Sequence, residues 1–214
     1  MSSGHKKAAI KALRSRYGVD RDVKIIPVGV ELCRVVSPEL VHHVYFNFVR
    51  DDMLGLRVQP GLGVTFPAVN AARDTISPRH QHTVDVVTGF VFLNNLVEPA
   101  VRQNGGWLFE AVNPLQPAFD NFLAFVDETI QSVGFFESLT TIDDYIEAVE
   151  SNRRTFLGVM PTYLYALIAK GEVAKAKKLA AEHREMSIQI GIERGFVQRV
   201  SNTQPYDEIL AMPG

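Results

Sequence analysis

The feature that most constrains the fold is a change of hydrophobic periodicity near Asn113. From Val23 to Val112, apolar residues alternate with polar ones or form short runs rich in β-branched side chains, as strands require. After Asn113 they recur at intervals of three and four, which is the spacing of one helical face. Strands in one part of the chain and helices in the other predict an α+β fold.

Five or six strands are expected between residues 23 and 112, joined by short connections with no helix between them. Such connections favour one antiparallel sheet. The strand candidates are "KIIPVGVELCRVV", "HVYFNFVR", "GLGVTF", "VDVVTGFVFLN" and "GGWLFEAV". Asp51 and Asp52 are turn residues and mark a hairpin between two strands.

Helices are predicted at the N-terminus and throughout the C-terminal half. The first covers residues 4–17, carries a basic face and ends at Gly18. The second covers 117–133, and its apolar stripe is expected to pack on the sheet: Phe119, Phe122, Leu123, Val126 and Ile130. A third follows Thr141 as N-cap, and two more are separated by Gly171. We expect an α+β domain over 1–155 and a helical extension over 156–214, packed together as one compact unit.

Composition sets limits on the cellular setting. Cys33 is the only cysteine, so the chain forms no internal disulfide, and its apolar surroundings predict a buried, unreactive thiol. The N-terminal segment is charged throughout and lacks the apolar core of a signal peptide. No apolar stretch reaches the roughly 20 residues that span a bilayer. A cytoplasmic protein with no membrane partner is therefore expected.

Charge is distributed unevenly, although the net charge is only -2. Residues 103–152 contain no Lys or Arg but nine acidic residues. Three of these acids, Asp143, Glu147 and Glu150, have the i, i+4, i+7 spacing of one helical face, where like charges repel. An acidic face that persists despite this repulsion indicates a partner with a basic surface. The other interpretation is a solvated helix whose Asp143 and Asp144 favour the helix dipole.

The candidate partner-binding residues combine these acids with nearby aromatic side chains, which add buried area if they are exposed. They are Asp143, Asp144, Glu147, Glu150, Tyr145 and Trp107. Direct binding of nucleic acid is not expected.

The histidine pairs raise the question of a metal site. His80 and His82 would share one face of an extended segment, but Asp85 would then lie on the other face. Further ligands would have to come from distant positions, namely His42, His43 or Glu31. We therefore predict no metal site and no cofactor. Motifs of serine hydrolases, phosphate-binding loops and zinc proteases are also missing from the sequence.

The layout resembles that of bacterial immunity-protein-like domains, which are encoded beside polymorphic toxins. The resemblance covers about residues 5–155 and depends on the basic first helix, "VYFNFVRDDMLGLRV", Trp107 and "SLTTIDDYIEAVES". It implies a non-enzymatic binding protein that neutralises a toxin. A toxin that acts on nucleic acid would present the basic surface that the acidic face requires.

Two alternatives stay open. One is a metal-dependent or small-molecule enzyme with its site near His80 and His82. The other is a scaffold or oligomerisation module that uses the C-terminal helices. A toxin gene beside the gene for this chain would favour the immunity protein, and a metabolic gene cluster would favour the enzyme.

Overall fold

The computed structural model describes residues 2–51, 55–76, 87–97, 106–110, 113, 115–151, 156–157, 159–193 and 203–213. The chain divides into two compact units. Unit 1 comprises Met1–Val64 and Gly89–Thr140, and unit 2 comprises Thr65–Thr88 and Thr141–Gly214. This division differs from the expected boundary at residue 155, because segment 65–88 and the helix after Thr141 belong with the C-terminal helices.

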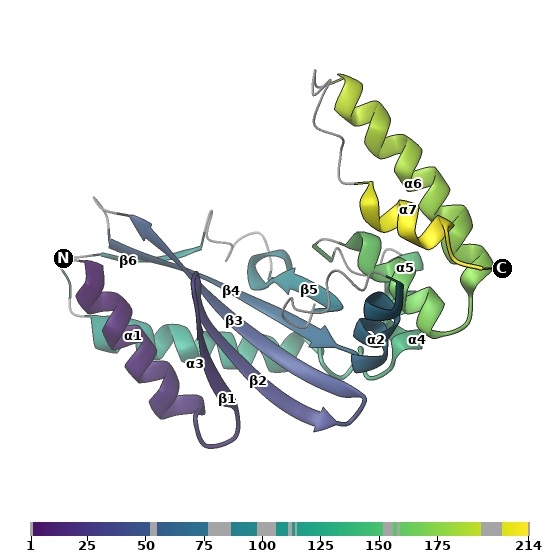
Figure 1. Cartoon of the computed structure of the whole chain (residues 1–214). Coiled ribbons are helices and arrows are strands. Elements are labelled where there is room, and N and C mark those ends of the chain that lie inside the picture. Colours follow the sequence, from purple (N-terminus) through teal and green to yellow (C-terminus); the bar gives the residue numbers. More distant parts are fainter. Residues whose placement is uncertain are drawn as a thin grey trace. The chain divides into compact units, whose positions relative to one another are not determined.

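Unit 1 is built on a six-stranded antiparallel sheet with the order β1-β2-β3-β4-β5 (Figure 1). Its strands are β1 (Asp22–Ile26), β2 (Gly29–Ser37), β3 (Leu40–Asp51), β4 (Gly55–Thr65), β5 (Gly89–Phe92) and β6 (Trp107–Glu110). Both β5 and β6 pair with β4, on the edge that β3 leaves free. The predicted α+β class and antiparallel sheet are confirmed.

Helices α1 (Ser2–Tyr17) and α3 (Leu115–Val133) pack on the same face of this sheet. Phe46 of β3 contacts both helices, with ring centroids 6.3 Å from Tyr17 and 6.3 Å from Phe122. The two helices are also joined directly. Asp127 of α3 accepts a hydrogen bond from the Tyr17 hydroxyl at 2.7 Å and forms an ion pair with Arg16 at 2.6 Å. The helix layer therefore closes one side of the sheet.

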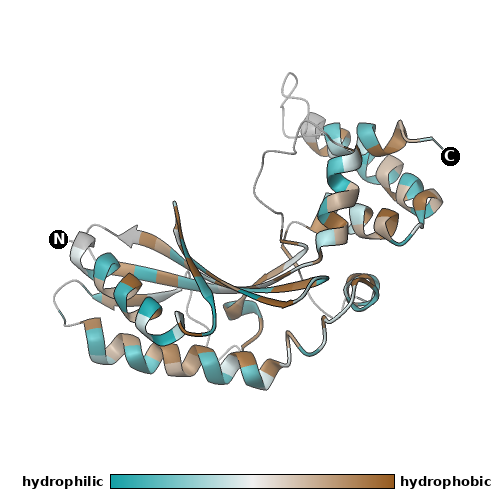
Figure 2. Ribbon diagram, turned by 60° about the horizontal axis from the view of Figure 1, so that its bottom comes forward, coloured by the Kyte–Doolittle hydropathy of each residue, from teal (hydrophilic) through white to brown (hydrophobic). Residues whose placement is uncertain are grey.

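The apolar stripe of α3 is the centre of this packing, and Figure 2 shows apolar and polar residues alternating along the long helix below the sheet. Phe109 of β6 lies 5.3 Å from Phe119 and 5.4 Å from Phe122 between ring centroids. The predicted cover of the sheet is confirmed, with Phe119, Phe122, Leu123 and Val126 buried and Ile130 half-buried. Gly134 follows α3 with φ of 54°, a left-handed conformation that favours glycine and ends the helix as predicted.

Unit 2 is helical: α2 (Pro67–Ile76), α4 (Ile142–Glu150), α5 (Val159–Ala169), α6 (Val173–Glu193) and α7 (Gln204–Leu210). Helix α5 packs against α2, α4 and α6, and α7 packs against α6. The break between α5 and α6 falls at Gly171, with φ of 81°, as the sequence predicts. Within the described ranges, no helix combines the length and apolar character that crossing a bilayer requires.

Two helices of unit 2 were not predicted. The expectation that no helix interrupts the strands is wrong, because α2 lies between β4 and β5. Val69, Ala72 and Ile76 of α2 do have the i, i+3, i+7 spacing of a helical face, but the segment is only 10 residues long and lies between strand-like stretches, so the helix was missed. Helix α7 is only 7 residues long and is held to α6 by Tyr206, which stacks on His183.

We predict that Phe122→Ala destabilises the protein by roughly 3–5 kcal/mol. The substitution removes a ring that packs on Phe46 of β3, on Phe109 of β6 and on Phe119 of its own helix. Denaturant unfolding measures the loss. The matched control is Phe125→Ala on the same helix, whose half-buried ring should cost less. A loss below about 1 kcal/mol for Phe122→Ala would show that this stripe does not hold unit 1 together.

Candidate functional site

Helix α4 carries most of the predicted partner-binding residues, and a capping box fixes where it begins. The Asp144 backbone N–H donates to the Thr141 hydroxyl at 3.1 Å, and the Thr141 N–H donates to the Asp144 carboxylate at 2.8 Å. Thr141 is therefore the N-cap that the sequence predicts. Asp144 therefore stabilises the first turn of the helix.

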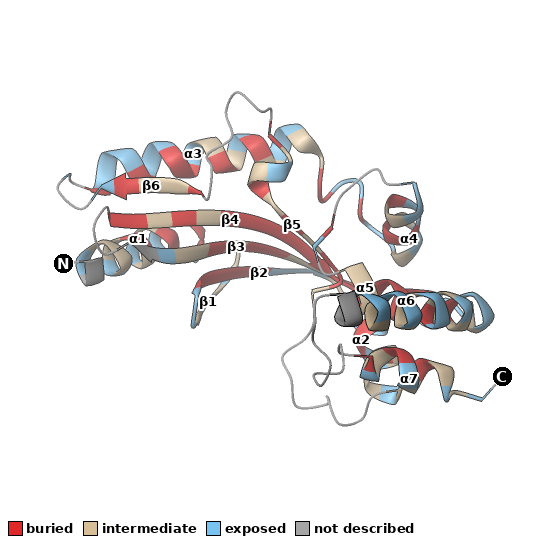
Figure 3. Cartoon of the chain, turned by 90° about the horizontal axis from the view of Figure 1, so that it is seen from above, coloured by how far each residue is buried: buried red, intermediate tan, exposed pale blue. Residues whose placement is uncertain are grey.

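The outer face of α4 consists entirely of carboxylates. Tyr145, Ile146 and Ala148 are buried, whereas the three exposed residues of the helix are Asp143, Glu147 and Glu150. The i, i+4, i+7 spacing thus places them together on the surface, and Figure 3 shows the exposed and buried sides of α4. We call these three residues the acidic face.

Two lysines of unit 2 offset part of the repulsion within the acidic face. Asp143 pairs with Lys170 at 2.7 Å, and Glu150 pairs with Lys175 at 2.6 Å. Lys175 lowers the pKa of the Glu150 carboxyl, as does the Tyr163 hydroxyl that donates to it at 2.7 Å. The sequence could not reveal these counterions, because they lie 27 and 25 positions away, Lys170 just after α5 and Lys175 in α6.

The two aromatic candidates differ in their unit and in their exposure. Tyr145 is 0% exposed, with its ring 5.3 Å from that of Phe156, so it offers no area to a partner. Trp107 belongs to unit 1, where its half-buried ring packs 5.4 Å from Phe122 and 5.6 Å from Phe125. Exposure, on which their proposed role depends, is thus absent for Tyr145 and partial for Trp107.

The histidines are distributed over different places. His80, His82 and Asp85 lie outside the described residues. His42 and His43 follow one another in β3 and therefore point to opposite faces of the sheet. His42 stacks on Phe136 with a centroid distance of 4.2 Å, whereas His43 points to the face opposite α1 and α3.

On that opposite face, His43 contacts Glu31. The sequence suggested Glu31 only as a distant ligand for a metal bound at His80 and His82. Glu31 and Cys33 of β2 pair directly across from Tyr45 and His43 of β3. The His43 Nδ1 lies 2.8 Å from the Glu31 Oε1 and 3.5 Å from the Cys33 Sγ. The Tyr45 hydroxyl donates to the same Oε1 at 2.7 Å. We call these four residues the Glu31 cluster.

Hydrogen bonds and burial determine the charge states in the Glu31 cluster. The hydrogen bond from His43, supported by the one from Tyr45, lowers the pKa of Glu31 to about 2. Burial, followed by the Glu31 charge, raises the pKa of Cys33 to about 11, so the thiol is protonated at neutral pH, as predicted. A thiol–imidazole–carboxylate relay uses both ring nitrogens. Here Cys33 and Glu31 approach the same nitrogen, so the arrangement does not form such a relay.

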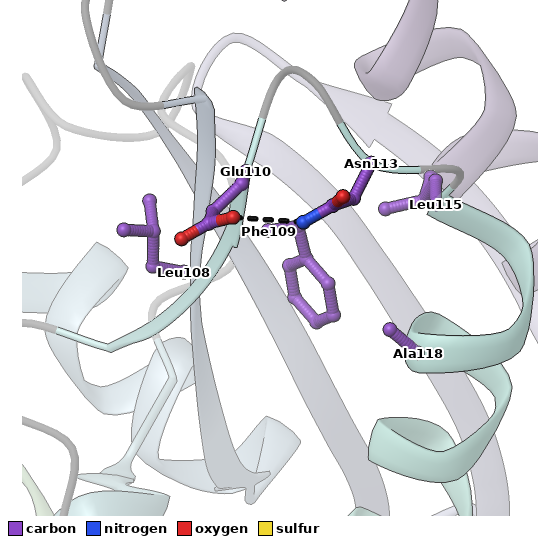
Figure 4. A pocket seen from close by; sticks show the side chains of 6 residues that line it. All are labelled: Leu108, Phe109, Glu110, Asn113, Leu115 and Ala118. Atoms are coloured by element: carbon purple, nitrogen blue, oxygen red, sulfur yellow. Dashed lines mark hydrogen bonds between the residues drawn. The ribbon is translucent and has the colours of Figure 1, made fainter.

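A cavity of about 420 Å³ lies between β6 and the start of α3 (Figure 4). Its lining is Leu108, Phe109, Glu110, Asn113, Leu115 and Ala118. The Asn113 amide donates to the Glu110 carboxylate at 2.7 Å, so the two polar side chains of the wall bond to each other. This cavity therefore presents a mainly apolar surface and no cluster of catalytic groups.

Comparison with known proteins identifies no relative of this chain: no family model, curated protein sequence or solved structure matches it. Its function is therefore argued from the geometry of its own residues.

We predict that His42 makes stability depend on pH. Burial, followed by the charges of Arg21 and Arg34, lowers the pKa of His42 to about 4 from its ordinary value near 6.5, against an opposing effect of Glu137. The unfolded chain then binds the proton more readily, so stability is lost as pH falls from about 6.5 to 4.

Denaturant unfolding at pH 7 and pH 5 measures this effect. His42→Phe keeps a ring against Phe136 and removes the titrating group, so its loss between the two pH values should be smaller than that of the wild type. An equal loss in both proteins would show that His42 is not responsible.

Proposed function

We propose that the chain is a non-enzymatic, cytoplasmic binding protein of the immunity type, which neutralises a toxin by covering a basic surface with the acidic face of α4. The observation that carries this proposal is the composition of that face: every exposed residue of α4 is a carboxylate. A toxin that acts on nucleic acid needs Lys or Arg side chains to meet phosphates. An array of carboxylates is complementary to such a surface.

The rest of α4 supports this role by holding the carboxylates in place. The capping box fixes the first turn, and buried Tyr145 and Ile146 anchor the inner side of the helix. Groups on a packed helix lose less conformational freedom on binding than groups on a loop, so less of the interaction free energy is lost to ordering. Asp143, Glu147 and Glu150 are thus displayed at a fixed spacing.

The lysines beside the acidic face do not prevent such binding. The side chains of the Asp143–Lys170 pair are 66% and 38% exposed, and those of Glu150–Lys175 are both 43% exposed. Exposed pairs of this kind contribute about 0–1 kcal/mol. An arginine of a partner, which can donate two parallel hydrogen bonds to one carboxylate, can replace a lysine at little cost.

The test uses the product of the gene adjacent to the one that encodes this chain, produced as a purified protein. Asp143→Lys with Glu147→Lys should slow its association about tenfold at low ionic strength, and the difference should shrink as salt is added. These two positions are chosen because Glu150 also bonds Tyr163 within unit 2. Stopped-flow or surface-based kinetics gives the rates.

The matched control is Glu182→Lys with Glu185→Lys, which makes the same change of net charge at two exposed positions of α6. Equal association rates for the two double variants would show that the acidic face does not select the partner. Full protection of a cell that expresses the adjacent gene by the α4 variant, at matched protein levels, would contradict the proposal in the same way.

A further inference from the structure

We propose that Glu31, Cys33 and His43 form a binding site for one divalent cation of the zinc class. This site is independent of the acidic face, because the Glu31 cluster belongs to unit 1 and α4 belongs to unit 2. The three side chains offer a carboxylate oxygen, a sulfur and an imidazole nitrogen within 4.8 Å of one another. These are the ligand atoms that zinc sites in proteins use.

The distances from the His43 Nδ1 to the other two ligand atoms fit neighbouring positions of a tetrahedral site after a small adjustment. Metal–sulfur and metal–nitrogen bonds of about 2.3 and 2.0 Å place neighbouring ligand atoms roughly 3.4–3.6 Å apart in a tetrahedron. The Cys33 Sγ and His43 Nδ1 are separated by 3.5 Å. The Glu31 Oε1 and His43 Nδ1 are 2.8 Å apart and would need to separate by about half an ångström when the cation replaces the proton between them.

The sheet holds the ligands in this arrangement before any cation binds. Cys33 and His43 are direct partners in the β2–β3 ladder, and Glu31 lies two positions before Cys33 on the same face. Strand β2 is paired on both sides, with β1 and with β3. The backbone that carries the ligands is thus fixed by hydrogen bonds on both of its edges.

Burial and ligand chemistry indicate which cation fits. Glu31, Cys33 and His43 are 8%, 7% and 7% exposed, so a bound ion would be largely shielded from water. A sulfur ligand beside imidazole favours zinc over magnesium or calcium, which prefer oxygen ligands. The Tyr45 hydroxyl, which donates to Glu31, would orient the carboxylate.

The second ring nitrogen of His43 takes no part in the cluster. The buried Nε2 of His43 has no hydrogen-bond partner among the described groups. The proposed cation binds Nδ1, which faces Glu31 and Cys33, so Nε2 lies outside the ligand set and the site is argued from the three ligand atoms alone. Cys33 separates a metal site from a hydrogen-bonded cluster, because a metal bond requires its thiolate whereas its contact with His43 does not.

The test uses the full chain, purified without a histidine tag, stripped with a chelator and titrated with Zn²⁺ by calorimetry and with Co²⁺ by absorption spectroscopy. We expect one equivalent of either ion to bind, with a sulfur-to-cobalt charge-transfer band. Cys33→Ser should abolish that band, and Glu31→Gln should weaken binding by at least about tenfold. Cys33→Ala keeps the Glu31–His43 hydrogen bond and should fold normally while binding more weakly.

The control is His42→Gln, which changes the neighbouring histidine on the opposite face and should leave cobalt binding unaltered. Circular dichroism and thermal melting confirm that each variant is folded. Absence of stoichiometric binding by the wild type overturns the proposal. Binding that persists unchanged in Cys33→Ser, or that is lost only in His80→Gln with His82→Gln, places the ion elsewhere and also overturns it.

Discussion

The contact of Phe46 with two helices at once is the constraint on which unit 1 depends. Strand β3 lies in the interior of the sheet, and its Phe46 is fully buried between Tyr17 of α1 and Phe122 of α3. Because α1 and α3 share one aromatic partner, neither can shift without disturbing the other. The bonds from Arg16 and Tyr17 to Asp127 add a polar link between the same two helices. The opposite face of β3 is thereby left for His43 and Tyr45.

The same alternation of side chains explains why one short segment serves two purposes. In "VHHVYF", residues 41–46, Val44 and Phe46 face the helix layer, whereas His43 and Tyr45 face the other way and belong to the Glu31 cluster. A shift of one residue in strand register would exchange these roles and place charged groups in the core. Packing of Val44 and Phe46 therefore also positions His43 opposite Cys33.

The sequence predicted the elements that show strong periodicity, and it missed those that depend on distant partners. The apolar stripe of 117–133, the cap at Thr141 and the break at Gly171 are local patterns, and the structure confirms them. Helix α2 has a short amphipathic pattern in Val69, Ala72 and Ile76, but its position between strands concealed it. The spacing of Asp143, Glu147 and Glu150 predicted a common face, but Lys170 and Lys175 became its counterions only through the packing of unit 2. Glu31 and His43 meet only through the cross-strand register, which spacing along the chain does not determine.

The order in which the two units use the chain has a consequence for synthesis. The chain crosses from one unit to the other three times, near residues 64, 88 and 140. Helix α2 leaves the ribosome before α5, against which it packs. Arg73 of α2 can therefore be buried only after nearly ninety further residues, up to the start of α5 at Val159, have been synthesised. The sheet is likewise completed only when β5 and β6 have been synthesised, after the segment Thr65–Thr88 that belongs to unit 2. Neither unit can be released by a single cut, and a nascent chain stopped between these crossings would expose apolar surface to chaperones and proteases.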